Sequence, residues 1–501
     1  MILLILIIVL LVAGLLCWYA DQLDSSWPRL IALAALSIDA LLVIVLIITA
    51  DSITIPQLAE SNHWLTQIRF DWLPRFGISL YLALDGLSLL LIALTIFLGF
   101  IALSSAWTEI TEKVGFFHFN LLWTLAGVLG VFLAMDLFLF FVCWEVMIVP
   151  MYLLISIWGH EQRHYAAIKF FIFTQISSLL MLIAIVSLVF NYRMESGVFS
   201  FNYFDLLNAS FDTDNGFWLM LGFFIAFVVK LPVVPFHTWL PDAHTQAPTA
   251  GSVILAGILL KTGAYGLIRF VVPLFPDAVY DFAPVAMGLG VVNIIYGAKL
   301  AFAQSDCKRL IAYSSISHMG FILLGVFAWN EIAFQGAVMT MLAHGISSAA
   351  LFMIAGALQE RIHTRDMGCM GGLWQDVPKL SGLALFFSIA ALGMPGLGNF
   401  IGEFLVLLGA FQQNILITSV AAIGLILAPV YSLILIQKTF HGQHLESHQL
   451  NDFGFREMLT MMVMVIILVW MGLFPQPMMD MARPTVDQSL QGVTVIAGER
   501  Q

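Results

Sequence analysis

Six titratable side chains lie inside long apolar runs of this 501-residue sequence. An ionisable group at mid-bilayer costs about 2.5–3.5 kcal/mol on insertion scales, so each is a candidate functional residue. Burial and neighbouring charges change the proton affinity of acids and amines, and imidazole titrates near neutral pH. The set has the chemistry of a proton relay and consists of Glu145, Lys230, Lys261, His318, His344 and Glu403.

A structural role is the alternative interpretation for each of these residues. Any one of them taken alone is as readily explained by a structural ion pair or by a hydrogen-bonded core histidine. Six such residues on six different predicted helices favour the relay. Lys299 is given less weight, because it lies near the end of a predicted helix and can extend its ammonium group to the surface.

The composition predicts an all-α integral membrane protein. Hydrophobic residues make up 61% of the chain, charged residues only 10%, and the mean hydropathy is +0.97, whereas soluble domains carry about 25% charged residues. No dense cluster of Lys and Arg indicates nucleic-acid binding. A span needs about 20 apolar residues, and about fourteen runs qualify, near 2–20, 29–49, 79–104, 116–134, 136–158, 167–191, 216–240, 250–272, 282–303, 309–328, 333–357, 379–411, 415–438 and 457–478.

Two of the predicted helices carry sequences that break a helix. The stretch "FFIAFVVKLPVVPFHTWLPDAH" places Pro232 and Pro235 just after Lys230, and "LGMPGLGNFIGEF" places Pro395, followed by three glycines, before Glu403. Proline cannot continue the helical hydrogen-bond ladder. Irregular backbone at membrane depth is tolerated where it is buried in protein or lines a wet cavity, so both breaks indicate a transport path.

The spacing of these residues suggests an internal repeat. Glu145 and Lys230 are 85 positions apart (230 − 145), and so are His318 and Glu403 (403 − 318). We expect two five-helix halves, 116–272 and 282–438, which an odd number of spans makes inverted. Residues 1–115 would form N-terminal helices, and 439–501 a loop, the last helix and a tail. The correspondence is imperfect, because Lys261 falls opposite Ile434 and the prolines do not coincide.

Basic residues in the connections predict the orientation of the chain. The N-terminal run reads as a retained first helix, since it lacks a positively charged leader region. With the N-terminus outside, the cytoplasmic loops hold about twice as many basic residues as the outer loops, which places both ends outside. The cytoplasmic set is Arg29, Lys113, Arg163, Lys169, Lys308, Arg309, Arg361, Arg365, Lys379, Lys438 and Arg456, and the outer set is Arg69, Arg75, Arg193, Arg269, Arg483 and Arg500.

Metal and nucleotide sites are disfavoured. "HEQRH" at 160–164 matches the zinc-protease pattern, but it follows Gly159 in a short loop and has no evident third ligand. His237 and His244 are seven positions apart around Pro241, which does not suit a metal or haem pair. The four cysteines are far apart, so no cluster or disulfide framework is supported. No nucleotide-binding glycine motif is present.

Several long motifs resemble one family. "KLPVVPFHTWLPDAHTQAPTAGSVILAGILLKTGAYGLIRF", "CKRLIAYSSISHMGF" and "GMPGLGNFIGEF" are similar to the core of the antiporter-like subunits of respiratory complex I. Glu403, where sister subunits tend to carry lysine, and "ERIHTRDMGCMGGLW" point to the subunit M branch, counterpart of mitochondrial chain 4. The resemblance covers nearly the whole chain, although the loop after "LISIWGH" is shorter than is usual in the family.

The resemblance implies a function and partners that composition alone does not. It implies fourteen transmembrane helices with two inverted repeats, in a bacterial inner membrane, between two related subunits and lipid. Protons would be translocated, driven by NADH oxidation and quinone reduction elsewhere. This chain would bind no NADH, FMN, iron–sulfur cluster or quinone, which belong to partner subunits.

The resemblance also assigns roles to the six titratable residues. Glu145 would pair with Lys230 in a first half-channel. Lys261 would connect through His318 and His344 to Glu403, which ends the second. A multi-subunit Na⁺/H⁺ antiporter, which shares the fold, and a passive membrane scaffold remain alternatives.

Overall fold

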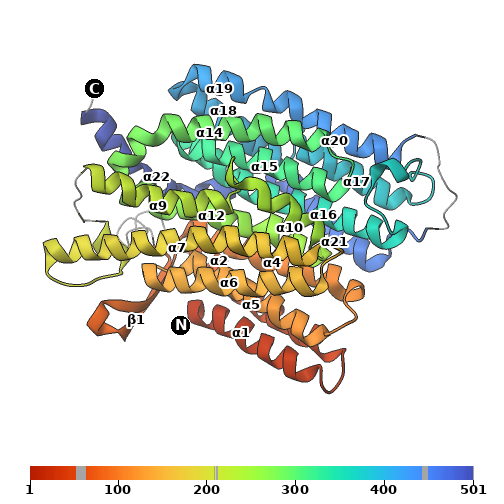
Figure 1. Cartoon of the computed structure of the whole chain (residues 1–501), viewed down its shortest axis with the longest axis horizontal. Coiled ribbons are helices and arrows are strands. Elements are labelled where there is room, and N and C mark those ends of the chain that lie inside the picture. The colour runs from red at the N-terminus through yellow and green to blue at the C-terminus, as the bar shows by residue number, and fades with distance from the viewer. Residues whose placement is uncertain (52–63, 208, 210–212, 443–449, 500–501) are drawn as a thin grey trace.

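The computed structural model describes residues 1–51, 64–207, 209, 213–442 and 450–499 as a bundle of long, roughly parallel or antiparallel helices (Figure 1). The elements are α1 (Ile2–Ala20), α2 (Trp27–Asp51), β1 (Thr66–Leu73), β2 (Ile78–Leu84), α4 (Gly86–Glu109), α5 (Val114–Leu133), α6 (Leu137–Trp158), α7 (Arg163–Ser196), α8 (Tyr203–Leu206), α9 (Thr213–Lys230), α10 (Trp239–Gln246), α11 (Thr249–Ile254), α12 (Leu260–Gly266), α13 (Val272–Leu274), α14 (Pro276–Phe302), α15 (Cys307–Val326), α16 (Glu331–Ile362), α17 (Pro378–Ala391), α18 (Gly398–Gln413), α19 (Ile415–Ala421), α20 (Gly424–Phe440), α21 (Phe455–Leu473) and α22 (Gln476–Glu499).

The predicted all-α membrane class is confirmed. Among the described residues, twelve helices are long and apolar enough to cross a membrane. Two shorter apolar helices, Asn215–Lys230 and Pro378–Ala391, lie where the sequence predicts broken spans. The total of fourteen spans therefore stays a prediction.

One predicted span begins differently. The sequence suggests a helix from residue 79, but 78–84 forms strand β2, which pairs antiparallel with β1. Gly77 turns the chain between them with φ 69°, a conformation that costs glycine nothing. Helix α4 starts only after Asp85, whose side chain accepts a hydrogen bond from the Ser88 amide as an N-cap.

The C-terminal region contains a helix where a tail was predicted. Helix α22 buries Met478, Ala482, Thr485, Val486 and Ser489, while the residues between them are more exposed. These positions recur every three to four residues, which is the spacing of one helical face. Helix α22 was not predicted as a span, because too few of its residues are apolar.

Both predicted helix breaks are present. Helix α9 ends at Lys230, a turn and a short 3₁₀ segment (Phe236–Thr238) follow, and α10 resumes at Trp239. Helix α17 ends at Ala391, and α18, which carries the buried Glu403, starts at Gly398. Each break falls in the fourth predicted span of its proposed half.

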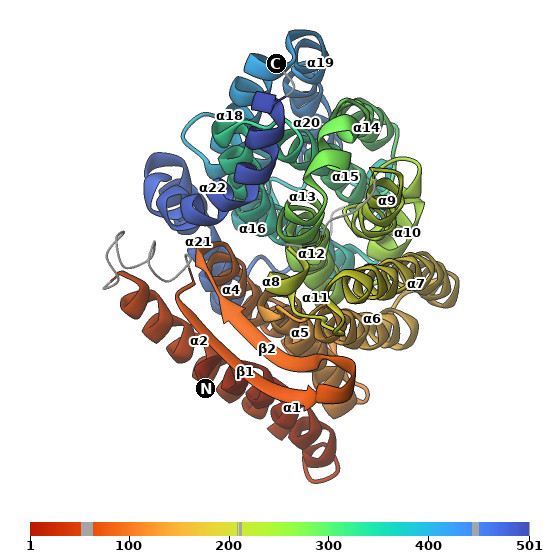
Figure 2. The same cartoon turned by 90° about the vertical axis from the view of Figure 1, so that its left-hand side faces the viewer.

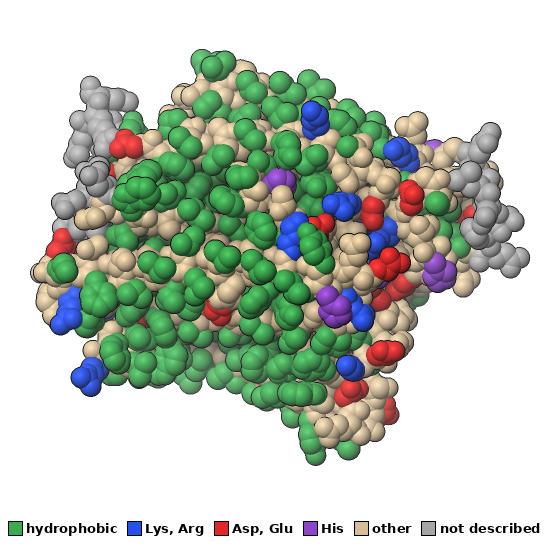
Figure 3. Space-filling model, in the orientation of Figure 1, with side chains coloured by type: hydrophobic (Ala, Val, Ile, Leu, Met, Phe, Trp, Pro, Cys, Tyr) green, Lys and Arg blue, Asp and Glu red, His purple; other side chains and the backbone are tan. Residues whose placement is uncertain are grey.

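The two ends of the bundle differ in charge. We call the end with the β1–β2 hairpin the hairpin end and the opposite one the charged end. Figure 3 shows charged and histidine side chains gathered on the right, at the charged end, and a mostly hydrophobic surface over the rest of this face. A wide apolar belt with a charged rim is the surface expected of a protein solvated by lipid.

The most enclosed segments run through the middle of the bundle. Residues Thr249–Leu274 and helix α16 (Glu331–Ile362) are the two spans whose most apolar windows are wholly buried. Viewed end-on, α11, α12 and α16 lie inside a surround of other helices (Figure 2). We call Thr249–Leu274 the central segment. It carries Lys261 and α16 carries His344, so the fold places both side chains at its centre.

Candidate functional site

A line of titratable side chains runs from the central segment into the second half of the bundle. The Nζ atom of Lys261 lies 2.8 Å from Nδ1 of His344 and donates a hydrogen bond to the carbonyl of Ala256 at 2.5 Å. The rings of His344 and His318 are 5.3 Å apart between centroids. His318 Nδ1 lies 2.7 Å from Oε1 of Glu403. Four predicted site residues are thus brought together in one connected row.

Every member of this row is buried. Lys261 is fully buried, and His344, His318 and Glu403 are each no more than 2% exposed. A buried charge is costly unless it is paired and hydrogen-bonded, and here each titratable group has a titratable neighbour. Two of these pairs, Lys261 with His344 and His318 with Glu403, lie within hydrogen-bond distance.

Tyr431 extends the row on one side. Its hydroxyl lies 3.1 Å from Nε2 of His318, so both ring nitrogens of that histidine have polar partners. Tyr431 lies on α20, in the fifth predicted span of the second half. Tyr431 was not predicted as a site residue, because a lone tyrosine in an apolar helix has no sequence pattern that distinguishes it from a packing residue.

Irregular backbone positions the two ends of the row. Lys261 lies on α12 between two π-helical segments of five residues each, Leu255–Leu259 and Leu267–Val271. π-Helical turns often mark functional sites. In the break before α18, a Cβ at Gly393 would lie 3.2 Å from Oε2 of Glu403, so the glycine leaves room for the carboxylate.

The first half is arranged differently. Glu145 on α6 is partly buried and accepts a 2.6 Å hydrogen bond from the Ser178 hydroxyl of α7. Lys230 is 1% exposed, and its Nζ atom has no hydrogen-bond partner among the described residues. That ammonium instead lies 5.1 Å from the ring centre of Phe170 and 5.7 Å from that of Trp144. The structure therefore does not place Glu145 and Lys230 in a direct ion pair.

Two cations predicted to lie in loops are buried. Arg269 was predicted to lie in an outer loop, but it lies in the last turns of the central segment, is 2% exposed and pairs with Asp85. Lys308, expected in a cytoplasmic loop, is fully buried at the start of α15. Both side chains have partners on other elements. Contacts between elements that are far apart in sequence cannot be predicted from the positions of loop charges.

A polar network surrounds Lys308 at the charged end. Its Nζ atom lies 3.5 Å from Nε2 of His160 and 3.4 Å from the carbonyl of Ala247. Glu109, at the end of α4, accepts hydrogen bonds from the Thr249 amide at 3.0 and 3.2 Å. This network joins the first half to the second where the central segment begins.

The motifs that resemble metal sites have other partners. His160 precedes α7, so the two histidines of "HEQRH" do not share one helix, and its ring contacts Lys308 and Gln359. His237 stands edge-on to Tyr296, and His244 stacks on Phe352 with centroids 4.3 Å apart. Within the described ranges, no group of three metal-ligating side chains is found.

Comparison with known proteins identifies the family. The family described as NADH:quinone oxidoreductase/Mrp antiporter, TM, matches residues 134–428. NADH-quinone oxidoreductase subunit M of Escherichia coli K12 is 51% identical over 489 residues, 96% of each chain, and that of Pseudomonas aeruginosa is 51% identical over 95% of each chain. This chain belongs to the NADH-quinone oxidoreductase subunit M family.

Solved structures agree with that assignment. A chain of respiratory complex I from Thermus thermophilus superposes with a TM-score of 0.88 at 31% identity, covering 98% of this chain and 100% of that one. A chain of the Mrp complex from Dietzia gives 0.80 at 21% identity over 98% of each chain, a likeness of fold alone. The predicted subunit M branch is thus confirmed.

Proposed function

We propose that this chain translocates protons across a bacterial inner membrane as a subunit of NADH-quinone oxidoreductase. The observation that carries the proposal is the connected row of Lys261, His344, His318 and Glu403 through the most enclosed part of the bundle. A row of buried acids and bases serves transport only if its proton occupancy changes. Such a change follows when a neighbouring charge moves, because opposite charges favour the ionised forms and burial disfavours them.

Residues 116–272 and 282–438 act as two half-channels in this proposal. The first half uses Glu145 and Lys230, and the second uses Glu403 with His318. Lys261 and His344 join the two. The breaks after Lys230 and before Glu403 lie in corresponding spans, which supports two repeats in inverted orientation, as broken helices do in many transporters.

The chemistry that drives transport is assigned to other subunits. NADH oxidation, FMN, iron–sulfur clusters and quinone reduction belong to partner chains, and two antiporter-like subunits flank this one in the membrane arm. The charged end, with Lys169, Arg309 and Arg365, faces the cytoplasm, because basic residues concentrate on that side of membrane proteins. The N- and C-termini then face the outer side.

Replacing Lys261 by Met in the intact complex tests this role. The side chain keeps its approximate length but loses its charge and its contact with His344. We expect the complex to assemble, while NADH-driven acidification measured in proteoliposomes is lost. Lys299→Met is the matched control, because Lys299 is exposed on α14. Normal pumping per NADH in Lys261→Met would refute the relay.

A subunit of a Na⁺/H⁺ antiporter is the second candidate, supported by the shared fold with the Mrp complex. Purifying the complex that contains this chain separates the two functions. Co-purifying NADH:quinone activity supports the first, and sodium-dependent proton exchange without NADH oxidation supports the second.

A further inference from the structure

A second buried charged cluster lies two helical turns from Lys261. Lys261, Tyr265 and Arg269 follow one another at intervals of four on the central segment, so they lie along one face towards the hairpin end. Eight residues of helix advance by about 12 Å. Arg269 is therefore a fixed positive charge between Lys261 and the hairpin end of the bundle.

We name Asp85, Ser88, Tyr265, Arg269 and Thr485 the Arg269 cluster. Arg269 pairs with Oδ2 of Asp85, which also accepts a 2.7 Å hydrogen bond from the Thr485 hydroxyl. The Nε atom of Arg269 donates to the Tyr265 hydroxyl at 3.2 Å, and that hydroxyl lies 3.3 Å from Ser88 Oγ. The cluster draws on α4, the central segment and α22.

The cluster is closed to solvent and rigidly held. The Arg269 and Asp85 side chains are 2% and 3% exposed. The guanidinium also lies 5.0 Å from the ring centre of Trp64. Tyr265 and Ser88 both donate to the carbonyl of Phe132, at 3.0 and 2.7 Å. An arginine fixed in this way cannot give up its proton and so cannot act as a carrier.

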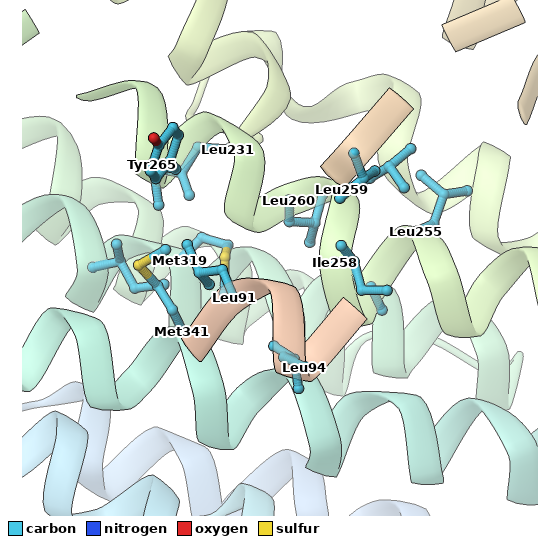
Figure 4. Packing of buried hydrophobic residues seen from close by; sticks show 14 of the residues in the cluster. Leu91, Leu94, Leu231, Leu255, Ile258, Leu259, Leu260, Tyr265, Met319 and Met341 are labelled. Carbon is cyan, nitrogen blue, oxygen red and sulfur yellow. The ribbon is translucent and has the colours of Figure 1, made fainter. Parts of the chain in front are cut away.

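Buried apolar side chains lie beside the cluster. Leu91 lies one turn beyond Ser88 on α4, Met341 lies one turn before His344 on α16, and both are buried. In Figure 4, Leu91, Met319 and Met341 gather in one group next to the segment that carries Tyr265. Apolar side chains offer a proton no hydrogen-bond partner, and a fixed arginine beside them repels protons, as in pores that exclude protons.

We propose that the Arg269 cluster is a proton barrier that closes the hairpin end of the path to Lys261. The inference rests on the proposed function, because a barrier is needed only if Lys261 exchanges protons. In this proposal, the pair of Asp85 and Arg269 has a function in addition to stabilising the fold. A buried ion pair can often be replaced by apolar residues without loss of stability, so stability alone does not account for it.

The test measures passive proton leak, which requires no NADH. Proteoliposomes containing the whole complex receive a potassium diffusion potential, and the resulting proton influx is followed with a fluorescent pH indicator. For Arg269→Met we expect a leak about tenfold above the unaltered complex, because one unit charge about 12 Å away at an effective dielectric near 20 changes a cation's occupancy by about that factor. Arg269→Lys keeps the charge and should stay tight. Arg69→Met, an exposed arginine of the hairpin, is the control.

Two further variants keep the test decisive. Asp85→Asn combined with Arg269→Gln removes both charges and leaves no unpaired buried charge, so it should assemble. It should leak less than Arg269→Met, because the negative charge of Asp85, which attracts protons, is removed together with the arginine. Arg269→Met combined with Lys261→Met should be tight again, because the path through Lys261 is gone.

Three outcomes would overturn the barrier. They are a tight Arg269→Met complex, equal leaks in Arg269→Met and Arg269→Lys, and a leak that persists in the double variant with Lys261→Met. None of them depends on whether Lys261→Met abolishes NADH-driven pumping, so the proposed function is judged separately.

Discussion

Each half of the bundle has two titratable residues at the same separation in sequence, but the two residues are in contact only in the second half. In the second half, His318 and Glu403, 85 positions apart (403 − 318), lie 2.7 Å from each other. In the first half, Glu145 and Lys230 have the same separation (230 − 145), yet the carboxylate is held by Ser178 and the ammonium by two aromatic faces.

The difference shows that equal spacing in sequence does not fix equal contact in space. In the second half, hydrogen bonds already join His318 to Glu403 and to Tyr431. Under the proposed relay, the first half would need Lys230 to move towards Glu145 before a proton passes, and its flexible four-carbon stem permits this movement. We therefore expect the contact between Glu145 and Lys230 in the first half to form and break during transport. The contact between His318 and Glu403 in the second half should persist.

Among the variants that compare the two halves, the largest effect is expected at Lys230. Lys230→Met removes an ammonium that makes no hydrogen bond within the described part of the chain, so the complex should assemble with unchanged thermal stability. NADH-driven pumping should fall by about 10²-fold, as for other groups that transfer protons. Lys438→Met, an exposed lysine on α20, is the control. Assembly loss in proportion to pumping loss would instead favour a passive scaffold.

Glu403→Gln should affect both pumping and stability. It weakens a buried contact with His318 that the first half lacks, and hydrogen bonds to charged groups contribute about 1.5–3 kcal/mol. We expect a lower unfolding temperature of the purified complex and a lower pumping rate. An unchanged unfolding temperature would show that the contact between His318 and Glu403 adds no more to stability than the unpaired Glu145 and Lys230 of the first half.

Ser178→Ala should make the two halves more alike. Without the serine hydroxyl, Glu145 is free to pair with Lys230, at a cost of about 0.5–1.5 kcal/mol for one lost hydrogen bond. We expect a cryo-EM map of the variant complex to place these two side chains within about 4 Å, the usual limit for an ion pair. Ser177→Ala is the control, because the Ser177 hydroxyl donates to the Thr174 carbonyl of its own helix. If Glu145 did not move, the idea that Ser178 and Lys230 compete for its carboxylate would be wrong.

The smallest effect concerns the contact between the halves at His160. Burial, followed by the charges of Lys308 and Arg365, lowers the pKa of His160 from 6.5 to about 3. Between these two pH values the unfolded chain takes up a proton that the folded chain does not, so stability falls as the pH falls below 6.5.

His160→Gln should remove part of that pH dependence, seen as a smaller drop in unfolding temperature between neutral and mildly acidic buffer. His164→Gln, at an exposed position four residues on, should leave it unchanged. An identical pH response in both variants would show that His160 contributes nothing to it.

Hydrophobic patterning allowed the sequence to predict most of the fold. The membrane class, the positions of the two breaks and the subunit M branch followed from apolar run length, proline placement and long motifs. Errors arose where run length misleads. Strand β2 is as apolar as a helix, and α22 is too polar for a membrane search although one of its faces is buried.

The sequence by itself determined which side chains are costly to bury, because a charge inside an apolar run is visible without knowing the fold. Glu145, Lys230, Lys261, His318, His344 and Glu403 were all found that way. Only the tertiary structure decided which of them touch, because contacts between helices depend on packing across residues far apart in the chain. It joined four of the six into a row, left Lys230 against aromatic rings, and moved Arg269 from an expected loop into a buried pair with Asp85.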